Sequence, residues 1–511
     1  MTRLQQRLQD VAPARLTAIR RGIEKESLRA QPDGALALTP HPAGLGSALT
    51  NPNITTDFSE SQLELVTGVH ADAQAAIDEL TRIHQFTYRV MAEAGDEMMW
   101  VSSMPCGLPT DETIPLGRYG SSNVGRAKSV YRMGLGHRYG RRMQTISGIH
   151  YNWSMPGLSN DEYFALIRNF RRQSFLLLVL FGASPAVCAS FVQGRQHELQ
   201  PLAEAEGTLH MPYGTSLRMG RLGYQSDAQA SLSVSYNSLE GYGASLQEAL
   251  TKPYPAYEAV GIRNPGGDYN QLATTLLQIE NEFYGTIRPK RVIFPGERPL
   301  HALRERGVEY VEVRCMDLNP FMAAGIDAAT ARFLDVFLLH CLLNDSPPDT
   351  PDEIAALARN QHRTAARGRE PGLTLERGGR DVLLADWGAE ILHECGPIAD
   401  AMDAATGTGS AYRDAVAAAV TAWSQPDTLP SARVLKALRE DHDGSFIRFV
   451  RAQSLQVQQA MLALPYPDEL HAHFRAQAEQ SVEAQKAIEA ADTMPFEIYR
   501  QAYLAPRRLI A

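Results

Sequence analysis

The spacing of apolar residues changes near residue 345, and this change constrains the fold of the 511-residue chain more than any other feature. Up to about residue 320, stretches with a spacing of two, typical of strands, alternate with stretches near 3.6, typical of amphipathic helices. After about residue 345 the chain is rich in Ala, Leu, Arg and Glu and follows the helical spacing almost throughout. We therefore predict a first region, 1–344, that combines strands and helices, and a mostly helical second region, 345–511.

Turn and capping signals divide both regions into elements. Pro351 follows Thr350, and Thr350 and Glu353 form a capping-box pair, so a helix should begin there. Ser159 and Glu162 predict another helix start, for a helix that runs toward residue 180. Strands are predicted at 17–30, 34–38, 54–67, 98–102, 145–155 and 309–315. Helices are predicted at 72–94, 383–404, 409–424, 445–463 and 467–492, a helix or irregular segment at 123–139, and a loop at 363–380. The expected class is α+β, an antiparallel sheet with attached helices.

Composition excludes several classes of partner. Lys and Arg number 49 against 58 Asp and Glu, so a net charge of -9 argues against nucleic acid. Residues 1–10 lack the apolar block of a signal peptide, and the apolar run 175–181 is too short to cross a membrane, so we expect a cytoplasmic protein. Five scattered cysteines argue against a zinc site or a disulfide scaffold. Mostly reduced thiols are expected, and a pairing of Cys341 with Cys395 stays open.

Acidic residues recur within strongly apolar strand patterns. Glu24 and Glu26 are two residues apart, so in a strand both project from one face. Glu64 lies among apolar residues in 54–67, and Asp57 lies at the other end of that segment. Glu312 shares one face of its strand with Arg314, while the valines on either side of Glu312 occupy the other face.

Two interpretations of these carboxylates compete. Each strand alone is compatible with a sheet that has one face in water. If the strands instead converge, the like charges need a divalent cation, and oxygen ligands favour magnesium or manganese over zinc. Such a cage beside Arg314 is typical of phosphate chemistry. The sequence has no P-loop, dinucleotide-binding, serine hydrolase or zincin motif, and a glycosidase would need only two acids.

Polar and apolar residues also alternate along the segment 143–154. His150 and Asn152 lie on one face of the predicted strand, and Tyr151 and Trp153 lie on the other. His150 is either a metal or phosphate contact or a structural histidine. Upstream, 116–140 is dense in Gly, Arg and Tyr, as expected of a segment that faces an anionic substrate.

Five blocks of the sequence resemble the proteobacterial type of glutamate-cysteine ligase, also called gamma-glutamylcysteine synthetase. They lie in that family's order and spacing within residues 17–325, at 22–29, 45–50, 54–58, 143–152 and 310–321. The resemblance implies ATP-dependent joining of the glutamate γ-carboxylate to the amine of L-cysteine through γ-glutamyl phosphate, the first step of glutathione biosynthesis. It also implies a glutamine synthetase-like carboxylate-amine ligase fold, whose antiparallel sheet curves into a saddle or open barrel with the metals on its concave face.

Carried over position by position, the resemblance implies roles for individual residues. The magnesium ligands, with manganese also suitable, would be Glu24, Glu26, Asp57, Glu64 and Glu312, with the pairing of carboxylates to ions left open. Arg314 would lie at the ATP phosphates or the acyl phosphate, and His150 on the metal and substrate face. The glutamate and cysteine pocket would be walled by Phe58, Tyr131, Arg132, Gln144, Tyr242 and Tyr284. Two alternatives stay open: a relative that accepts another amine, and a non-catalytic paralogue. The oligomeric state also stays open, and the sequence is compatible with a monomer.

Overall fold

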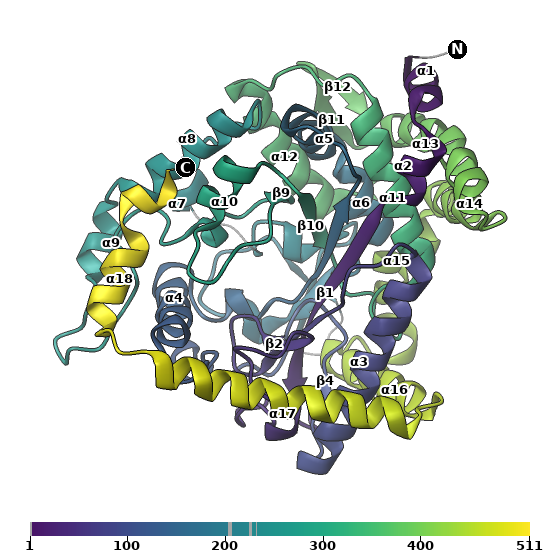
Figure 1. Ribbon diagram of the computed structural model, residues 1–511. Coiled ribbons are helices and arrows are strands. Elements are labelled where there is room, and N and C mark those ends of the chain that lie inside the picture. The colour runs from purple at the N-terminus through teal and green to yellow at the C-terminus, as the bar shows by residue number, and fades with distance from the viewer. Residues whose placement is uncertain (1–2, 203–206, 224–226, 231, 511) are drawn as a thin grey trace.

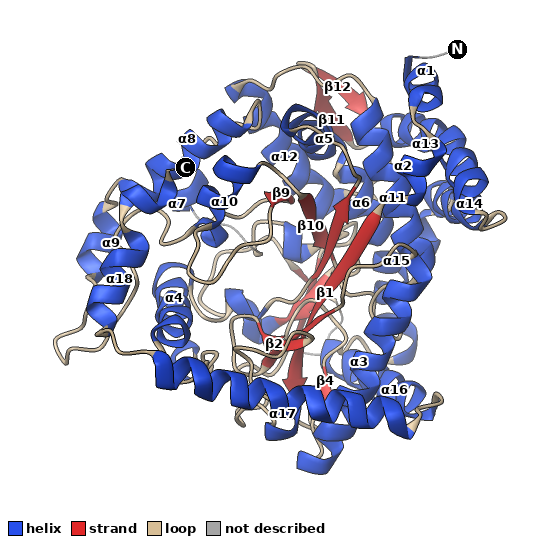
Figure 2. Cartoon of the chain, in the orientation of Figure 1, coloured by secondary structure: helices blue, strands red, loops and turns tan. Residues whose placement is uncertain are grey.

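A twisted antiparallel sheet lies at the centre of the computed structural model, which describes residues 3–202, 207–223, 227–230 and 232–510 (Figures 1 and 2). Within this described part the strands pair in the order β2-β3-β1-β5-β10-β9, and β4 pairs with the end of β1. The strands are β1 (Arg20–Ala30), β2 (Ile54–Thr56), β3 (Gln62–Val66), β4 (Met98–Met99), β5 (Ile149–Ser154), β9 (Ile287–Lys290) and β10 (Tyr310–Met316). All of these pairings are antiparallel, so the predicted α+β class with an antiparallel sheet is confirmed.

Helices surround this sheet and make up most of the second half of the chain (Figure 2). In the first region they are α1 (Arg3–Asp10), α2 (Pro13–Thr17), α3 (Ala73–Ala94), α4 (Asn123–Tyr139), α5 (Asn160–Gln173), α6 (Phe175–Phe181), α7 (Asp227–Ala230), α8 (Leu239–Thr251), α9 (Pro255–Val260), α10 (Pro299–Arg306) and α11 (Ala328–Leu343). In the second region they are α12 (Pro351–Arg367), α13 (Leu384–Thr406), α14 (Ala411–Ser424), α15 (Pro430–Asp441), α16 (Phe446–Ala463), α17 (Asp468–Ala491) and α18 (Phe496–Leu504). None of the described helices has the length and apolar character needed to span a membrane.

The alternation of side chains along the strands gives the sheet two different faces. Ile23, Tyr151, Val311 and Val313 are fully buried on one face, where α3, α5 and α6 pack on the strands. This packing belongs to one hydrophobic core that extends from the first region into the helices of the second. The opposite face, which carries the acidic residues, is therefore left for the functional site.

Local signals predicted the starts of two helices. Ser159 and Glu162 form a complete capping box at α5. Thr350 accepts a hydrogen bond from the backbone N–H of Glu353, and Pro351 is the first residue of α12. Both predicted starts are therefore confirmed. They could be predicted from the sequence because a capping interaction spans only three residues.

Other boundaries differ from the prediction. The segment 54–67 is two strands, β2 and β3, joined by a turn in which the N–H of Asp57 bonds to the carbonyl oxygen of Gln62. The predicted strand 34–38 reduces to a single bridge between Ala30 and Leu36. The predicted loop 363–380 instead contains the end of α12 and most of a hairpin of β11 (Thr374–Arg377) and β12 (Arg380–Leu383). Gly378 and Gly379 close this hairpin with positive φ, as a two-residue turn of this kind requires.

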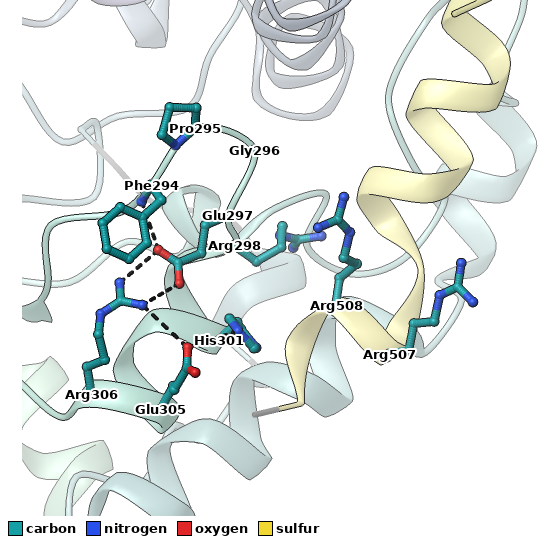
Figure 3. A pocket seen from close by; sticks show the side chains of 10 residues that line it. All are labelled: Phe294, Pro295, Gly296, Glu297, Arg298, His301, Glu305, Arg306, Arg507 and Arg508. Atoms are coloured by element: carbon teal, nitrogen blue, oxygen red, sulfur yellow. Dashed lines mark hydrogen bonds and ion pairs between the residues drawn. The ribbon is translucent and has the colours of Figure 1, made fainter.

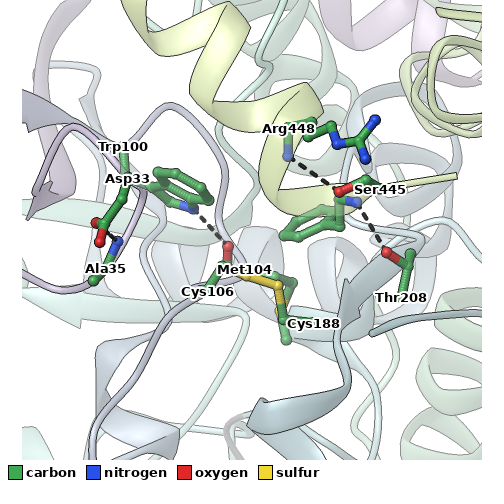
Figure 4. The surroundings of a disulfide bond; sticks show 10 residues. Asp33, Ala35, Trp100, Met104, Cys106, Cys188, Thr208, Ser445 and Arg448 are labelled. Carbon is green, nitrogen blue, oxygen red and sulfur yellow. Dashed lines mark hydrogen bonds between the residues drawn. A yellow bond between two sulfur atoms is a disulfide. The ribbon is translucent and has the colours of Figure 1, made fainter. Parts of the chain in front are cut away.

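A disulfide joins two cysteines that the sequence left unpaired. Cys106 and Cys188 are bonded, with their Cα atoms 5.4 Å apart, and Cys188 ends β6 (Ala186–Cys188) of a small sheet with β7 (Gln200–Pro201) and β8 (Thr208–His210) (Figure 4). The expectation of reduced thiols is thus wrong for this pair. Cys341 and Cys395 are both free and buried, so the pairing left open between them does not form. The bonded cysteines are 82 residues apart, a separation that carries no local signal.

Candidate active site

Strand register gathers the acidic residues on one face of the sheet. Glu26 on β1 lies opposite Glu64 on β3, and Glu24 lies opposite His150 on β5. Farther across the sheet, Glu312 on β10 lies between Asn152 on β5 and Arg288 on β9. Residues from strands far apart in the sequence therefore form rows across one face, because facing residues in an antiparallel ladder point to the same side.

This face forms the floor of a cavity of about 410 Å³. Helix α4 lines the cavity with residues spaced three or four apart, which include Lys128, Tyr131 and Arg132. Helix α18, near the C-terminus, contributes Tyr499 and Tyr503. The predicted residues that line the cavity are Glu24, Glu26, Asp57, Phe58, Glu64, Tyr131, Arg132, Gln144, His150, Tyr284, Glu312 and Arg314. Glu26 and Glu312 are almost fully buried, so the alternative of a sheet face open to water is wrong.

Glu24, His150 and Glu312 form a cluster of potential metal ligands on this face. One ligand atom from each lies within 4.8 Å of the other two. His150 Nδ1 is 3.1 Å from Glu24 Oε2, and Asn152 Nδ2 donates to Glu24 Oε1 at 2.8 Å. Burial favours a higher pKa for Glu24, but the hydrogen bond with His150 holds the pKa below its ordinary value. Burial, followed by Arg314, lowers the pKa of His150, which favours the neutral imidazole, the form that can offer a lone pair to a metal ion.

Positive charge compensates Glu26 and Glu64 only in part: Arg218 and Arg314 act on Glu26, and Arg132 acts on Glu64. Burial, with Asp57 as the next cause, raises the pKa of Glu26 to about 8, although the N–H of Gly148 donates to Glu26 Oε2 at 2.6 Å. Burial and the neighbouring carboxylates of Glu24, Asp57 and Glu26 raise the pKa of Glu64 well above its ordinary value. Buried carboxylates that repel one another favour either protons or a bound cation.

Three cations surround Glu312 at another part of the cavity. Arg314 Nη1 donates to Glu312 Oε2 at 2.9 Å, and Lys290 Nζ lies 3.3 Å from Glu312 Oε1. Arg288 Nη1 is 3.9 Å from Glu312 Oε2. Burial opposes ionisation of Glu312, but Lys290 and Arg314 hold its pKa well below the ordinary value. One carboxylate shared by three cations leaves positive charge available for an anionic ligand.

Polar and aromatic side chains complete the wall. Gln144 Nε2 donates to the hydroxyl of Tyr284 at 2.6 Å. Arg132 donates to backbone carbonyl oxygens and lies over the ring of Tyr119. Tyr242 is not brought to this cavity: it lies on α8, buried, with its ring centroid 5.8 Å from that of Phe164 and 5.3 Å from that of Tyr236. Tyr242 therefore packs in the hydrophobic core and does not line the cavity, although its hydroxyl interacts electrostatically with Arg288 and Glu312, which do line it.

Several lining residues were missed. Arg288 and Lys290 alternate with Ile287 and Pro289 on β9, the same pattern that drew attention to Glu312 and Arg314, so alternation was a usable signal. Lys128 lies one helical turn before Arg132 and could have been found by helical spacing. Tyr499 and Tyr503 had no distinguishing signal, since a spacing of four is equally typical of core packing.

A second hollow, of about 460 Å³, adjoins the cavity and shares Gly296 and Glu297 with it (Figure 3). Arg306 donates to both carboxylate oxygens of Glu297, at 2.7 and 2.8 Å, and to Glu305 at 3.4 Å. The group of Glu297, His301 and Glu305 is therefore part of a salt-bridge network in which Arg306 pairs with both carboxylates.

The fold and the main cavity together define an enzyme that handles anionic substrates on the polar face of an antiparallel sheet. The chain belongs to the glutamate-cysteine ligase family, whose family model matches residues 4–364. The resemblance in the sequence is thereby confirmed.

Individual relatives agree over nearly the full length. Glutamate-cysteine ligase of Alcanivorax borkumensis is 45% identical, with 98% of this chain and 99% of the relative covered. The protein of the same name from Pseudomonas entomophila is 47% identical, with 95% and 93% covered. The solved structure of the glutamate-cysteine ligase of Francisella tularensis, in complex with AMP, has a TM-score of 0.90 and 37% identity, with 96% of this chain and 98% of that chain covered.

Proposed function

We propose that the protein joins the γ-carboxylate of L-glutamate to the amine of L-cysteine and cleaves ATP to ADP and phosphate, in the first step of glutathione biosynthesis. Membership of the glutamate-cysteine ligase family supports this reaction. The structural observation that carries it is the joint exposure of five carboxylates, His150 and Arg314 to one cavity. Activation of a carboxylate by a polyphosphate needs this combination, because negative charge must be both held and moved.

ATP is the co-substrate in this proposal. The relative from Francisella tularensis was solved with AMP, which supports a site for an adenine nucleotide here. Arg288, Lys290 and Arg314 around Glu312 are suited to the phosphates of ATP, because all three are cationic and the two guanidinium groups also match phosphate oxygens in geometry.

Magnesium, or manganese, fits the donor set. Glu24, Glu26, Asp57, Glu64 and Glu312, with His150 beside them, would hold the ions. The raised pKa of Glu26 and of Glu64 supports this, since burial and neighbouring carboxylates cause both shifts and a cation would relieve them. When bound, such ions neutralise the polyphosphate and polarise phosphoryl and acyl oxygens.

The residues of the chain then act in two steps. The glutamate γ-carboxylate attacks the γ-phosphorus of ATP, the bond to the bridging oxygen breaks, and ADP leaves as γ-glutamyl phosphate forms. Arg314 stabilises the charge on the transferred phosphoryl group. The neutral amine of cysteine adds to the acyl carbon of γ-glutamyl phosphate, the nitrogen loses a proton, and phosphate leaves as the amide forms. Gln144 and Tyr284 orient the amino-acid substrates from the wall.

We further infer the setting of this activity. Residues 1–344 form the catalytic unit, and residues 345–511 form a mostly helical region packed on it, from which α18 reaches the cavity. The sheet adopts the saddle of the glutamine synthetase-like ligases, and the enzyme works in the cytoplasm on small-molecule substrates.

The test is ADP release by the purified protein with ATP, glutamate and a titration of magnesium chloride, with and without cysteine. We expect cysteine-dependent turnover and γ-glutamylcysteine as the product identified by mass spectrometry. Cysteine should exceed 2-aminobutyrate and glycine as the acceptor. Absence of turnover with all three amines would overturn the proposed function, and a preference for another amine would overturn the acceptor.

A further inference from the structure

The cations that line the cavity form two groups with different partners. Arg288, Lys290 and Arg314 gather around Glu312 on the sheet, as described above. Lys128 and Arg132 belong to α4 and lie four residues apart, so they share the helix face that lines the cavity. The first group suits the phosphates of ATP, which leaves the α4 group without an assigned ligand.

Arg132 is largely satisfied by the chain itself. Its Nη1 donates to the carbonyl oxygen of Lys128 at 3.0 Å, and its Nη2 lies 3.5 Å from that of Thr56. Its Nε donates to the carbonyl oxygen of Asp57. The guanidinium carbon lies 4.5 Å from the centroid of the Tyr119 ring. These contacts fix the guanidinium in place, so it acts mainly as a support for its surroundings.

Lys128 differs because, among the residues that the structure describes, no carbonyl oxygen accepts a hydrogen bond from its ammonium group. Its Nζ lies 5.1 Å from the centroid of the Tyr119 ring, and in the part of the chain that the structure describes it forms no ion pair with a carboxylate. The side chain is half-buried and lines the cavity. Burial, followed by Arg132, lowers the pKa of Lys128 to about 8, with Glu64 opposing the shift. An ammonium in such a place is stabilised when a ligand supplies the missing negative charge.

We propose that Lys128 is a specificity-determining residue that binds the α-carboxylate of an amino-acid substrate. This inference rests on the proposed function, because both glutamate and cysteine carry an α-carboxylate that takes no part in the reaction. A carboxylate at Lys128 would form a charge-assisted hydrogen bond and would orient the rest of the substrate toward the acidic residues of the sheet. The same contact would distinguish an amino acid from the corresponding amine or acid that lacks the α-carboxylate.

The test couples removal of the lysine charge to removal of the substrate carboxylate. Lys128→Met and wild type are assayed with glutamate against 4-aminobutanoate, and with cysteine against 2-aminoethanethiol, each analogue lacking one α-carboxylate. For one of the two substrates, we expect Lys128→Met to lower kcat/KM at least about tenfold with the amino acid and less than about threefold with its analogue. Where an analogue is not turned over, its inhibition constant replaces kcat/KM. The substrate that shows this coupling is the one whose carboxylate Lys128 binds.

Controls separate binding from structural damage. Lys128→Arg should recover part of the loss, whereas Lys252→Met, which removes an exposed lysine directly after α8, should match wild type. Equal losses with amino acids and analogues, or a rise confined to the KM for ATP, would overturn the role of Lys128. If wild type forms no γ-glutamylcysteine, the proposed function itself fails. An active wild type with no coupling at Lys128 refutes this inference alone.

Discussion

Arg314 and Glu312 lie two residues apart on β10, and Arg314 Nη1 donates to Glu312 Oε2 at 2.9 Å on the cavity side of the strand. Arg314→Met is expected to lower kcat at least about 100-fold, because the transferred phosphoryl group would lose a preorganised donor. ADP release under saturating substrates measures this effect. Arg314→Lys should retain more activity than Arg314→Met, while Arg413→Met, at an exposed ion pair, should retain all of it. Activity of Arg314→Met within threefold of wild type would contradict the assignment.

Glu26 should make the stability of the metal-free protein depend on pH. Its pKa is raised from 4.5 to about 8, first by burial and then by Asp57. Between these values the folded protein keeps the proton and the unfolded chain has lost it, so the free energy of unfolding falls as pH rises. The fall contributed by Glu26 is at most about 1.4 kcal/mol per pH unit.

Denaturant unfolding of Glu26→Gln and wild type in EDTA, from pH 5 to pH 8, checks this. The variant should gain stability relative to wild type as pH rises. Glu483→Gln, at an exposed position on α17, is the control and should show a constant difference. A difference for Glu26→Gln that does not change with pH would refute the prediction.

Tyr284 and Tyr242 should respond differently to removal of the hydroxyl group. Tyr284→Phe loses the hydrogen bond from Gln144 at the cavity wall and should raise the KM for an amino-acid substrate by about three- to tenfold. Tyr242→Phe keeps the aromatic packing on Phe164 and Tyr236 and should leave the kinetics unchanged. Steady-state kinetic assays of both variants measure kcat and the KM for each amino-acid substrate. A kinetic defect in Tyr242→Phe as large as that in Tyr284→Phe would place Tyr242 in the substrate pocket after all.

Asp335 on α11 holds the buried end of β1. It pairs with Arg21 at 2.9 Å and accepts hydrogen bonds from Tyr151 at 2.8 Å and Tyr412 at 3.1 Å. Asp335→Ala should lower the free energy of unfolding by about 3 to 5 kcal/mol, because Arg21 would remain buried without a counter-charge. Urea unfolding measures this loss in the free energy of unfolding. The control is Asp381→Ala, at an exposed site, whose free energy of unfolding should lie within about 0.5 kcal/mol of wild type. A loss near that of the control would show that the network contributes little.

Strand alternation allowed much of the site to be predicted. Glu24 with Glu26, His150 with Asn152, and Glu312 with Arg314 each occupy the expected polar face, because the side-chain period of a strand is a local property. The position of Tyr242 was not predictable in the same way. Helix α8 carries apolar residues on several of its sides. Only tertiary packing decides which side of the helix faces the cavity.

By itself the sequence determined the α+β class, the family, the capped helix starts and the polar face of each strand, because backbone geometry and capping act over a few residues. The tertiary structure alone decided the pairing of Glu26 with Glu64 and of Glu24 with His150 across the sheet, the surroundings of Lys128 and the bond between Cys106 and Cys188. It also brought Tyr499 and Tyr503 of α18 to a cavity built mostly from the first region. These contacts depend on strand register and on the packing of distant segments, which are set by the burial of the whole core rather than by neighbours in the chain.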